Sequence, residues 1–224
     1  MEIINNNLIL TKDCSDTGFC NMQKDLQMFE HAIKINKIIF RLYTWIKPTL
    51  SIGKFEKWQK TINGIDIVRR PTGGRSVLHT DDISYCLAIP TKFYPQDTTI
   101  LGLTEAIHRI FLRIFFNLGI KAKICGKQKK GKGRHCFDSI SYNEIAVNGK
   151  KIMGSAQYRT RFGSLQHGSI LYSIPEDLYI KVYGSDYNRE RFTCVKDLLN
   201  IKREEFIDKA FNIVKEVGVE DCCI

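Results

Sequence analysis

Apolar residues recur at helical spacing in three stretches of the chain, and each stretch predicts a helix with one buried face. The first covers residues 22–33, and polar residues 15–17 just before it offer capping side chains. The second covers residues 98–118 and ends at Gly119, and the third covers residues 204–217. His108 sits beside the apolar stripe of the second helix, and we interpret it as a boundary residue rather than a ligand.

Short segments rich in β-branched and aromatic residues predict the strands. They cover residues 41–47, 49–53, 65–68, 76–79, 83–89 and 165–172. Residues 142–147 and 151–158 flank Asn148-Gly149, which is the strongest short signal for a β-hairpin. The pattern predicts an α+β fold, with a large, mainly antiparallel sheet flanked by helices. We expect residues 1–224 to form a single domain with no accessory C-terminal domain.

The chain carries 34 basic and 24 acidic residues, a net charge of +10. This charge favours an acidic partner, and nucleic acid, an anionic membrane surface or an acidic carrier protein would each fit. No run of about 18 apolar residues predicts a membrane span. The first eleven residues do not resemble a signal peptide, so we expect a cytoplasmic protein.

Eight cysteines are present, but none forms a C-x-x-C pair, so we expect no metal site. One of them, Cys136, follows the basic, glycine-rich stretch 126–134, a setting that favours a thiolate. A thiol with a pKa of about 8.5 is only about 3% ionised at pH 7. Lowering that pKa by about 1.5 units, worth roughly 2 kcal/mol, would ionise half of it. A structural role for this cysteine remains the alternative.

Two further segments could form a ligand site. Residues 69–79, RRPTGGRSVLH, combine two glycines that allow close backbone approach with the charges of Arg70 and Arg75. Residues 149–157, GKKIMGSAQ, start a strand whose alternation sends Lys150 and Lys151 to opposite faces. The small residues at 154–156 leave room for a narrow ligand. A tight turn and an ordinary hairpin with surface lysines are the alternative readings.

Together, RRPTGGRSVLH, CFDSISYNEI, GKKIMGSAQYR and LQHGSILY resemble the signature blocks of the lipoate/biotin ligase and octanoyltransferase superfamily. The resemblance is closest to the octanoyltransferases that are similar to lipoate ligases, and Asn21, Met22 and Asp25 also fit this family. It implies a biotin/lipoate ligase catalytic domain, related to those of class II synthetases, with a tunnel for an acyl chain.

The resemblance also implies residue roles. Cys136 takes the acyl group, Lys151 lowers the pKa of that cysteine, and Lys150 is solvated. His79 and His167 either shape the pocket or serve in strand packing. The substrate-binding residues implied are Arg70, Thr72, Gly73, Gly74, Arg75, His79, Gly154, Ser155, Ala156, Gln157, His167 and Gly168.

The activity implied is transfer of an octanoyl group from octanoyl-acyl-carrier protein to a lysine of a lipoyl-domain or glycine-cleavage H-type protein, without a cofactor. An ATP-dependent lipoate–protein ligase that forms an acyl-adenylate is the alternative, although ligases usually have a third glycine where this chain has Arg75. Protein-to-protein octanoyl transfer and a non-catalytic module for acidic partners also remain open. Nucleic-acid binding is disfavoured, because the basic stretch contains no aromatic residues for stacking.

Overall fold

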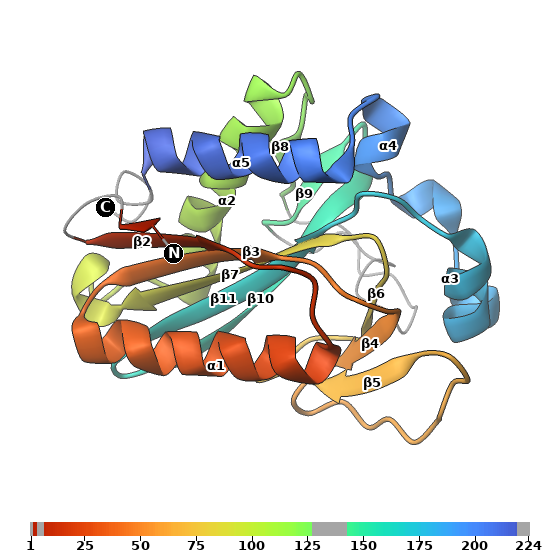
Figure 1. Ribbon diagram of the computed structural model, residues 1–224, viewed down its shortest axis with the longest axis horizontal. Helices are drawn as coiled ribbons and strands as arrows, with labels where there is room; N and C mark the ends of the chain where they lie inside the picture. The colour runs from red at the N-terminus through yellow and green to blue at the C-terminus, as the bar shows by residue number, and fades with distance from the viewer. Residues whose placement is uncertain (1, 4–6, 127–142, 219–224) are drawn as a thin grey trace.

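The computed structural model describes residues 2–3, 7–126 and 143–218, and its centre is a large mixed sheet (Figure 1). In the described residues this sheet has eight strands in the order β1-β2-β3-β7-β11-β10-β9-β8. They are β1 (Glu2–Ile3), β2 (Leu8–Lys12), β3 (Ile38–Tyr43), β7 (Ile83–Pro90), β11 (Gly163–Ile170), β10 (Lys150–Thr160), β9 (Ile145–Val147) and β8 (Lys123–Ile124). Only the β2–β3 pair is parallel among these neighbours, so the predicted mainly antiparallel sheet is confirmed.

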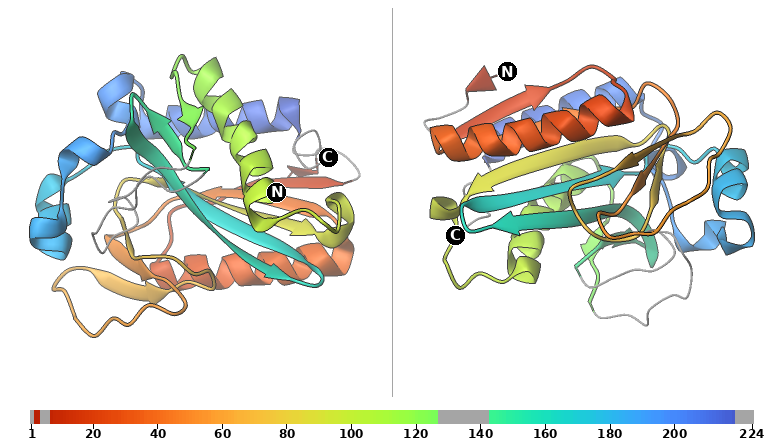
Figure 2. Two further views of the ribbon diagram at one scale, coloured as in Figure 1. Left: turned by 180° about the vertical axis from the view of Figure 1, so that it is seen from behind. Right: turned by 90° about the horizontal axis from the view of Figure 1, so that it is seen from below.

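Helices cover both faces of the large sheet. The helix α1 (Gly18–Ile35) lies along one face, and α2 (Ile100–Asn117) and α5 (Arg203–Val217) lie on the other, as Figures 1 and 2 show. Successive side chains of a strand point to opposite faces of the sheet and so pack into the two hydrophobic cores. In β7, Leu87 packs with α2, whereas Cys86 and Ala88 belong to the cluster under α1. The sheet is therefore buried on both sides over its central strands.

A smaller sheet lies at one end of the large one (Figure 1). Its strands are β5 (Asp66–Arg69), β4 (Thr49–Ile52) and β6 (Val77–His79), in that order. The short helices α3 (Glu176–Tyr183) and α4 (Val195–Leu198) follow β11, and 3₁₀ turns span Thr91–Phe93, Gly184–Asp186 and Arg189–Arg191. The small sheet and α3 share a separate hydrophobic cluster, which includes Leu50, Leu78 and Tyr179.

The local signals in the sequence account for the ends of the main elements. Thr17 caps α1, because its hydroxyl accepts a hydrogen bond from the Cys20 N–H at 3.2 Å. Asn148 and Gly149 have positive φ angles of 49° and 77°, as a type I′ turn requires, and the predicted hairpin is confirmed as β9–β10. His108, however, is fully buried on α2, so its interpretation as a boundary residue is wrong.

Two of the sequence-based expectations, on Cys136 and on a membrane span, remain to be compared with the structure. Cys136 and the basic stretch at 127–134 lie outside the described residues. Within the described part of the chain, no helix is both long enough and apolar enough to cross a membrane.

Candidate active site

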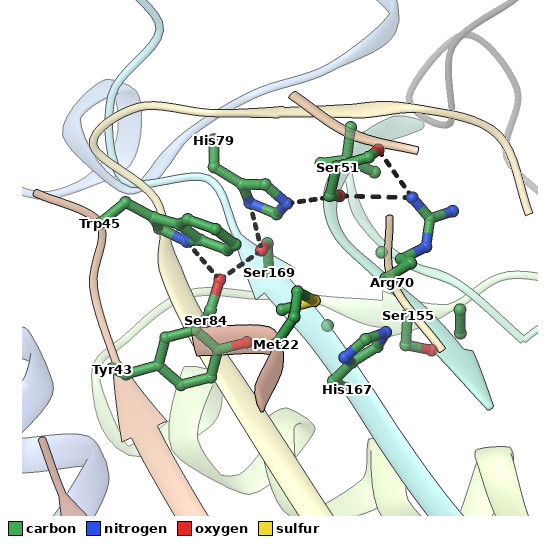
Figure 3. A pocket seen from close by; sticks show the side chains of 14 residues that line it. Met22, Tyr43, Trp45, Ser51, Arg70, His79, Ser84, Ser155, His167 and Ser169 are labelled. Atoms are coloured by element: carbon green, nitrogen blue, oxygen red, sulfur yellow. Dashed lines mark hydrogen bonds between the residues drawn. The ribbon is translucent and has the colours of Figure 1, made fainter. Parts of the chain in front are cut away.

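A narrow cavity of about 40 Å³ lies where α1, the large sheet and the small sheet meet (Figure 3). The exposed surface of its wall is mostly apolar, although many of the lining side chains carry polar groups. It is lined by Met22, Tyr43, Trp45, Ser51, Arg70, Val77, His79, Ser84, Gly154, Ser155, Ala156, His167, Gly168 and Ser169. The structure thus brings together residues from both segments that the sequence singled out.

The β10–β11 ladder forms one wall of the cavity. Its antiparallel register places Ser155 opposite Gly168 and Ala156 opposite His167. A Cβ atom at Gly168 would lie 2.4 Å from the carbonyl oxygen of Gly154 and 2.6 Å from the ring of Tyr85. Position 168 therefore needs glycine for the close packing of the two strands beside the cavity.

Arg70 binds the glycine loop that follows it. This buried guanidinium donates hydrogen bonds to the carbonyl oxygens of Ser51 at 2.8 Å, Gly73 at 2.9 Å and Arg75 at 2.6 Å. Gly74 has a φ of 91°, a conformation that favours glycine. Arg70 lines the cavity and also fixes the shape of the loop, so its donors are directed largely at backbone carbonyls.

His167 is held between a carboxylate and a hydroxyl. Its Nδ1 lies 3.0 Å from Oδ2 of Asp25, and its Nε2 lies 2.7 Å from the hydroxyl of Thr72. Burial lowers the pKa of His167, although Asp25 opposes this change, so the imidazole is neutral at pH 7. Nδ1–H then donates to Asp25, and Nε2 accepts from Thr72. Asp25 also accepts a hydrogen bond from Arg41 at 2.7 Å.

His79 occupies a matching position on the other side of the cavity. Its Nδ1 lies 2.8 Å from Oδ2 of Asp82, its Nε2 lies 2.8 Å from the hydroxyl of Ser51, and Trp45 stacks on the ring at 3.9 Å between centroids. Burial would raise the pKa of Asp82, but the charge and hydrogen bond of His79 outweigh it, and that pKa is lowered. The two histidines are thus fixed in orientation by independent hydrogen-bonded chains.

Lys151 is fully buried, and its ammonium pairs with the carboxylate of Glu144. Lys150 is exposed, so the predicted separation of the two lysines to opposite faces is confirmed. Lys151 does not line the cavity. Glu144 comes two residues after the segment that contains Cys136, which the structure does not describe.

His108 contributes a contact that the sequence did not predict. Its Nδ1–H donates to the carbonyl oxygen of Asn143, and its Nε2 lies 2.8 Å from the hydroxyl of Ser155. Burial lowers the pKa of His108 to about 4, despite the bond to Asn143, so the imidazole is neutral and Nε2 accepts from Ser155. Its position between Ile107 and Ile110 on the apolar stripe was the signal for burial.

Five of the predicted binding residues do not line the cavity. Thr72 acts through His167, and Gly73 and Gly74 belong to the loop that Arg70 holds. Gln157 donates to the side-chain oxygen of Gln166 at 3.0 Å. Arg75 lines a separate hollow, beside Trp58 and Tyr183.

Comparison with known proteins identifies the family of the chain. A family model described as the lipoyl protein ligase A/B catalytic domain matches residues 18–215. The chain belongs to this family.

Among curated relatives, the octanoyltransferase LipM of Staphylococcus aureus is 36% identical over 217 residues, covering 89% of this chain and 75% of that protein. The octanoyltransferase LipM of Carboxydothermus hydrogenoformans is 35% identical over 178 residues, covering 75% of this chain and 66% of that protein. The chain therefore spans about two thirds to three quarters of the length of these relatives.

Solved structures show the same fold at lower identity. A lipoate-protein ligase A with bound ATP matches with a TM-score of 0.71 and 21% identity, over 94% of this chain and 84% of that one. A bi-partite lipoate protein ligase from Thermoplasma acidophilum matches with a TM-score of 0.66 and 20% identity, over 94% and 83%. The predicted lipoate/biotin ligase fold is thereby confirmed.

Within this lipoyl ligase-type domain, three described cysteines are poor nucleophiles. Burial raises the pKa of Cys86, of Cys125 and, to about 11, of Cys194. Each therefore remains a thiol at pH 7. Cys14 and Cys20 are also free thiols. Among the residues with described positions, no group of three or more His, Cys, Asp or Glu side chains could hold a metal ion.

Proposed function

We propose that this protein is an acyltransferase that moves an octanoyl group from octanoyl-acyl-carrier protein to a lysine of a lipoyl-accepting protein, through a thioester on Cys136. The observation that carries the proposal is its similarity, at 32 to 36% identity over most of the chain, to proteins named octanoyltransferase LipM. The narrow, apolar-walled cavity between the small sheet and β10 supports it, because an extended alkyl chain suits such a wall.

The reaction has two half-reactions. The Cys136 thiolate attacks the carbonyl carbon of the donor thioester, and the thiol of the carrier protein leaves. The neutral amine of an acceptor lysine then attacks octanoyl-Cys136, forms the amide and returns the cysteine as a thiol. A thioester already stores enough free energy to form an amide, so the transfer consumes no nucleotide, and the covalent intermediate divides one difficult step into two.

Lys151 is the residue we assign to activation of Cys136. Its ammonium is withdrawn from water, and a charge in such a site acts on its surroundings with less screening than a solvated one. Glu144 partly offsets this charge and holds the ammonium in place. Lys151 therefore favours the thiolate from a fixed position, without belonging to the wall of the acyl cavity.

The proposed partners are both proteins with acidic surfaces. The net charge of +10 would steer an acidic acyl-carrier protein and an acidic lipoyl domain or glycine-cleavage H-type protein toward this protein. The rate of association should then fall as the ionic strength rises. We place the protein in the cytoplasm, where carrier protein and acceptor would both be available.

The test is the intact mass of the protein after incubation with octanoyl-acyl-carrier protein in the absence of ATP. We expect one octanoyl adduct, which disappears in Cys136→Ala. Addition of an acceptor lipoyl domain should remove the adduct and produce octanoylated acceptor. The absence of any adduct, with acceptor modification only when ATP and free lipoate are supplied, would instead identify an ATP-dependent lipoate–protein ligase.

A further inference from the structure

The cavity is too small for the group that the proposed reaction requires. Its volume of about 40 Å³ has room for only about three water molecules, at roughly 10–15 Å³ of such space for each. An eight-carbon chain occupies several times that space. A chain that lies fully within the cavity must therefore displace at least one of the side chains that line it.

Hydrogen bonds hold most of the large lining side chains in place. The Tyr43 hydroxyl donates to Asp25 at 3.1 Å, and Trp45 Nε1 donates to Ser84 at 2.9 Å. His79, His167 and Arg70 each have two or more polar contacts with neighbouring residues. Moving any of these side chains would leave buried polar groups without partners, which is costly.

Met22 differs from these residues in chemistry and in contacts. This residue is 7% exposed, and it packs in the apolar cluster that includes Tyr43 and Trp45. Figure 3 shows it reaching between the two histidines that flank the cavity. An unbranched thioether has three rotatable bonds and no hydrogen bond to lose. Val77, another apolar lining residue, is β-branched and stiff.

The backbone on either side of Met22 is fixed. Asn21 accepts a hydrogen bond from Arg41 at 2.7 Å and donates one to the carbonyl oxygen of Thr44 at 3.2 Å. One turn further along α1, Asp25 binds both Arg41 and His167. The start of α1 therefore stays in place, and space in the cavity can be gained most easily by rotation of the Met22 side chain.

We propose that Met22 is the gate of the acyl site and determines the length of chain that the protein accepts. The octanoyl chain enters the space that the Met22 side chain leaves, and the rotated thioether then packs against the chain. This inference rests on the proposed transferase function. It assigns chain-length specificity to one residue of α1, outside the glycine loop and the β10–β11 wall.

The test uses acyl-carrier protein loaded with hexanoyl, octanoyl, decanoyl or dodecanoyl groups. The rate of acyl-adduct formation is followed by intact mass for the wild-type protein and for three variants. Met22→Ala should raise the decanoyl-to-octanoyl rate ratio at least tenfold, because the cavity becomes larger. Met22→Phe should lower the octanoyl rate at least tenfold and affect hexanoyl less. Met22→Leu, which conserves volume, should keep the wild-type order of preference.

Met28→Ala is the matched control, because Met28 lies on the same helix, packs against the same apolar cluster and does not line the cavity. It should leave the preference unchanged, and circular dichroism shows whether each variant is folded. Folded Met22→Ala and Met22→Phe proteins with the wild-type order of chain lengths would overturn the gate while leaving the transferase intact. A wild-type protein that forms no adduct with any chain length would refute the proposed function, and the gate with it.

Discussion

Lys151 and Glu144 form an ion pair that is almost completely withdrawn from water, with 0% and 9% of their side chains exposed. Lys151 lies on β10 and Glu144 lies immediately before β9, so the β9–β10 hairpin brings them together. Such a pair is stable because each charge compensates the other where solvent cannot. The lysine that we assign to activation of Cys136 is therefore also a structural residue, and tests of its role must separate the two.

The first prediction concerns stability. Lys151→Met removes the ammonium that faces the buried Glu144 carboxylate, and we expect a loss of about 3–5 kcal/mol in the free energy of unfolding. The double variant Lys151→Met/Glu144→Gln removes both charges and should recover most of that loss. Urea denaturation measures all three proteins, with Lys150→Met as the exposed neighbouring control. Equal losses in the single and double variants would contradict the buried pair.

The second prediction concerns the thiolate. If Lys151 favours ionised Cys136, its removal should raise the pH at which adduct formation reaches half its maximum rate, by about 1 unit or more. Glu144→Gln removes the carboxylate that offsets the Lys151 charge and should shift that midpoint to lower pH. The rate of octanoyl-adduct formation between pH 5 and 9 measures both shifts. The same pH midpoint in both variants would show that Lys151 does not activate Cys136.

The third prediction concerns the pH dependence of stability through His108. Burial lowers its pKa from 6.5 to about 4, so between these values the unfolded chain binds a proton that the folded protein does not. The free energy of unfolding is therefore unaffected by protonation of His108 above about pH 6.5. It falls as the pH is lowered, by a total of about 3 kcal/mol at pH 4. The lowered pKa of His167 acts in the same direction.

The variant His108→Gln tests this assignment, because glutamine can reach the same partners and does not titrate. Its free energy of unfolding, measured in urea from pH 7 to pH 4, should fall less steeply than that of the wild type. His31→Gln, an exposed position on α1, should retain the wild-type slope. An unchanged slope in His108→Gln would show that another group controls the loss.

The fourth prediction concerns the hydroxyl that orients His167. Thr72→Val keeps the shape of the side chain but leaves Nε2 of the buried imidazole without its 2.7 Å partner. We expect a loss of about 1–3 kcal/mol in stability and a slower formation of the octanoyl adduct, because His167 lines the cavity. Thr72→Ser retains the hydroxyl and should behave like the wild type in both measurements. Equal loss in both variants would indicate a packing effect of the methyl group.

Much of the fold could be predicted because its signals are local. The stripe of apolar residues in α2, the cap at Thr17 and the Asn148-Gly149 turn each act through neighbours in the chain. Their boundaries agree with the structure to within a few residues, and the alternation that separated Lys150 from Lys151 holds as well. Local geometry was sufficient in each of these cases.

In the site, too, residues within local motifs were predicted and contacts between distant residues were not. The sequence identified His79, His167 and the glycine loop, since they occur in motifs that resemble one family. It did not identify Trp45, whose ring stacks on His79, and it assigned His108 to the helix boundary. Each of these two residues contacts a partner that is distant in the sequence. The pattern of residues along one sequence does not show such contacts. The assignment of Cys136 remains a prediction.

The sequence by itself determined the fold class and the family, and it named several of the residues that line the cavity, because periodicity, turn chemistry and motifs are properties of consecutive residues. Only the tertiary structure decided how those residues are used. It placed Glu144 beside Lys151, turned the Arg70 guanidinium toward the loop backbone and put Met22 into the cavity. The physical reason is that ionic pairing, hydrogen bonding and cavity size depend on distances between side chains, which exist only once the strands have been assembled into the sheet.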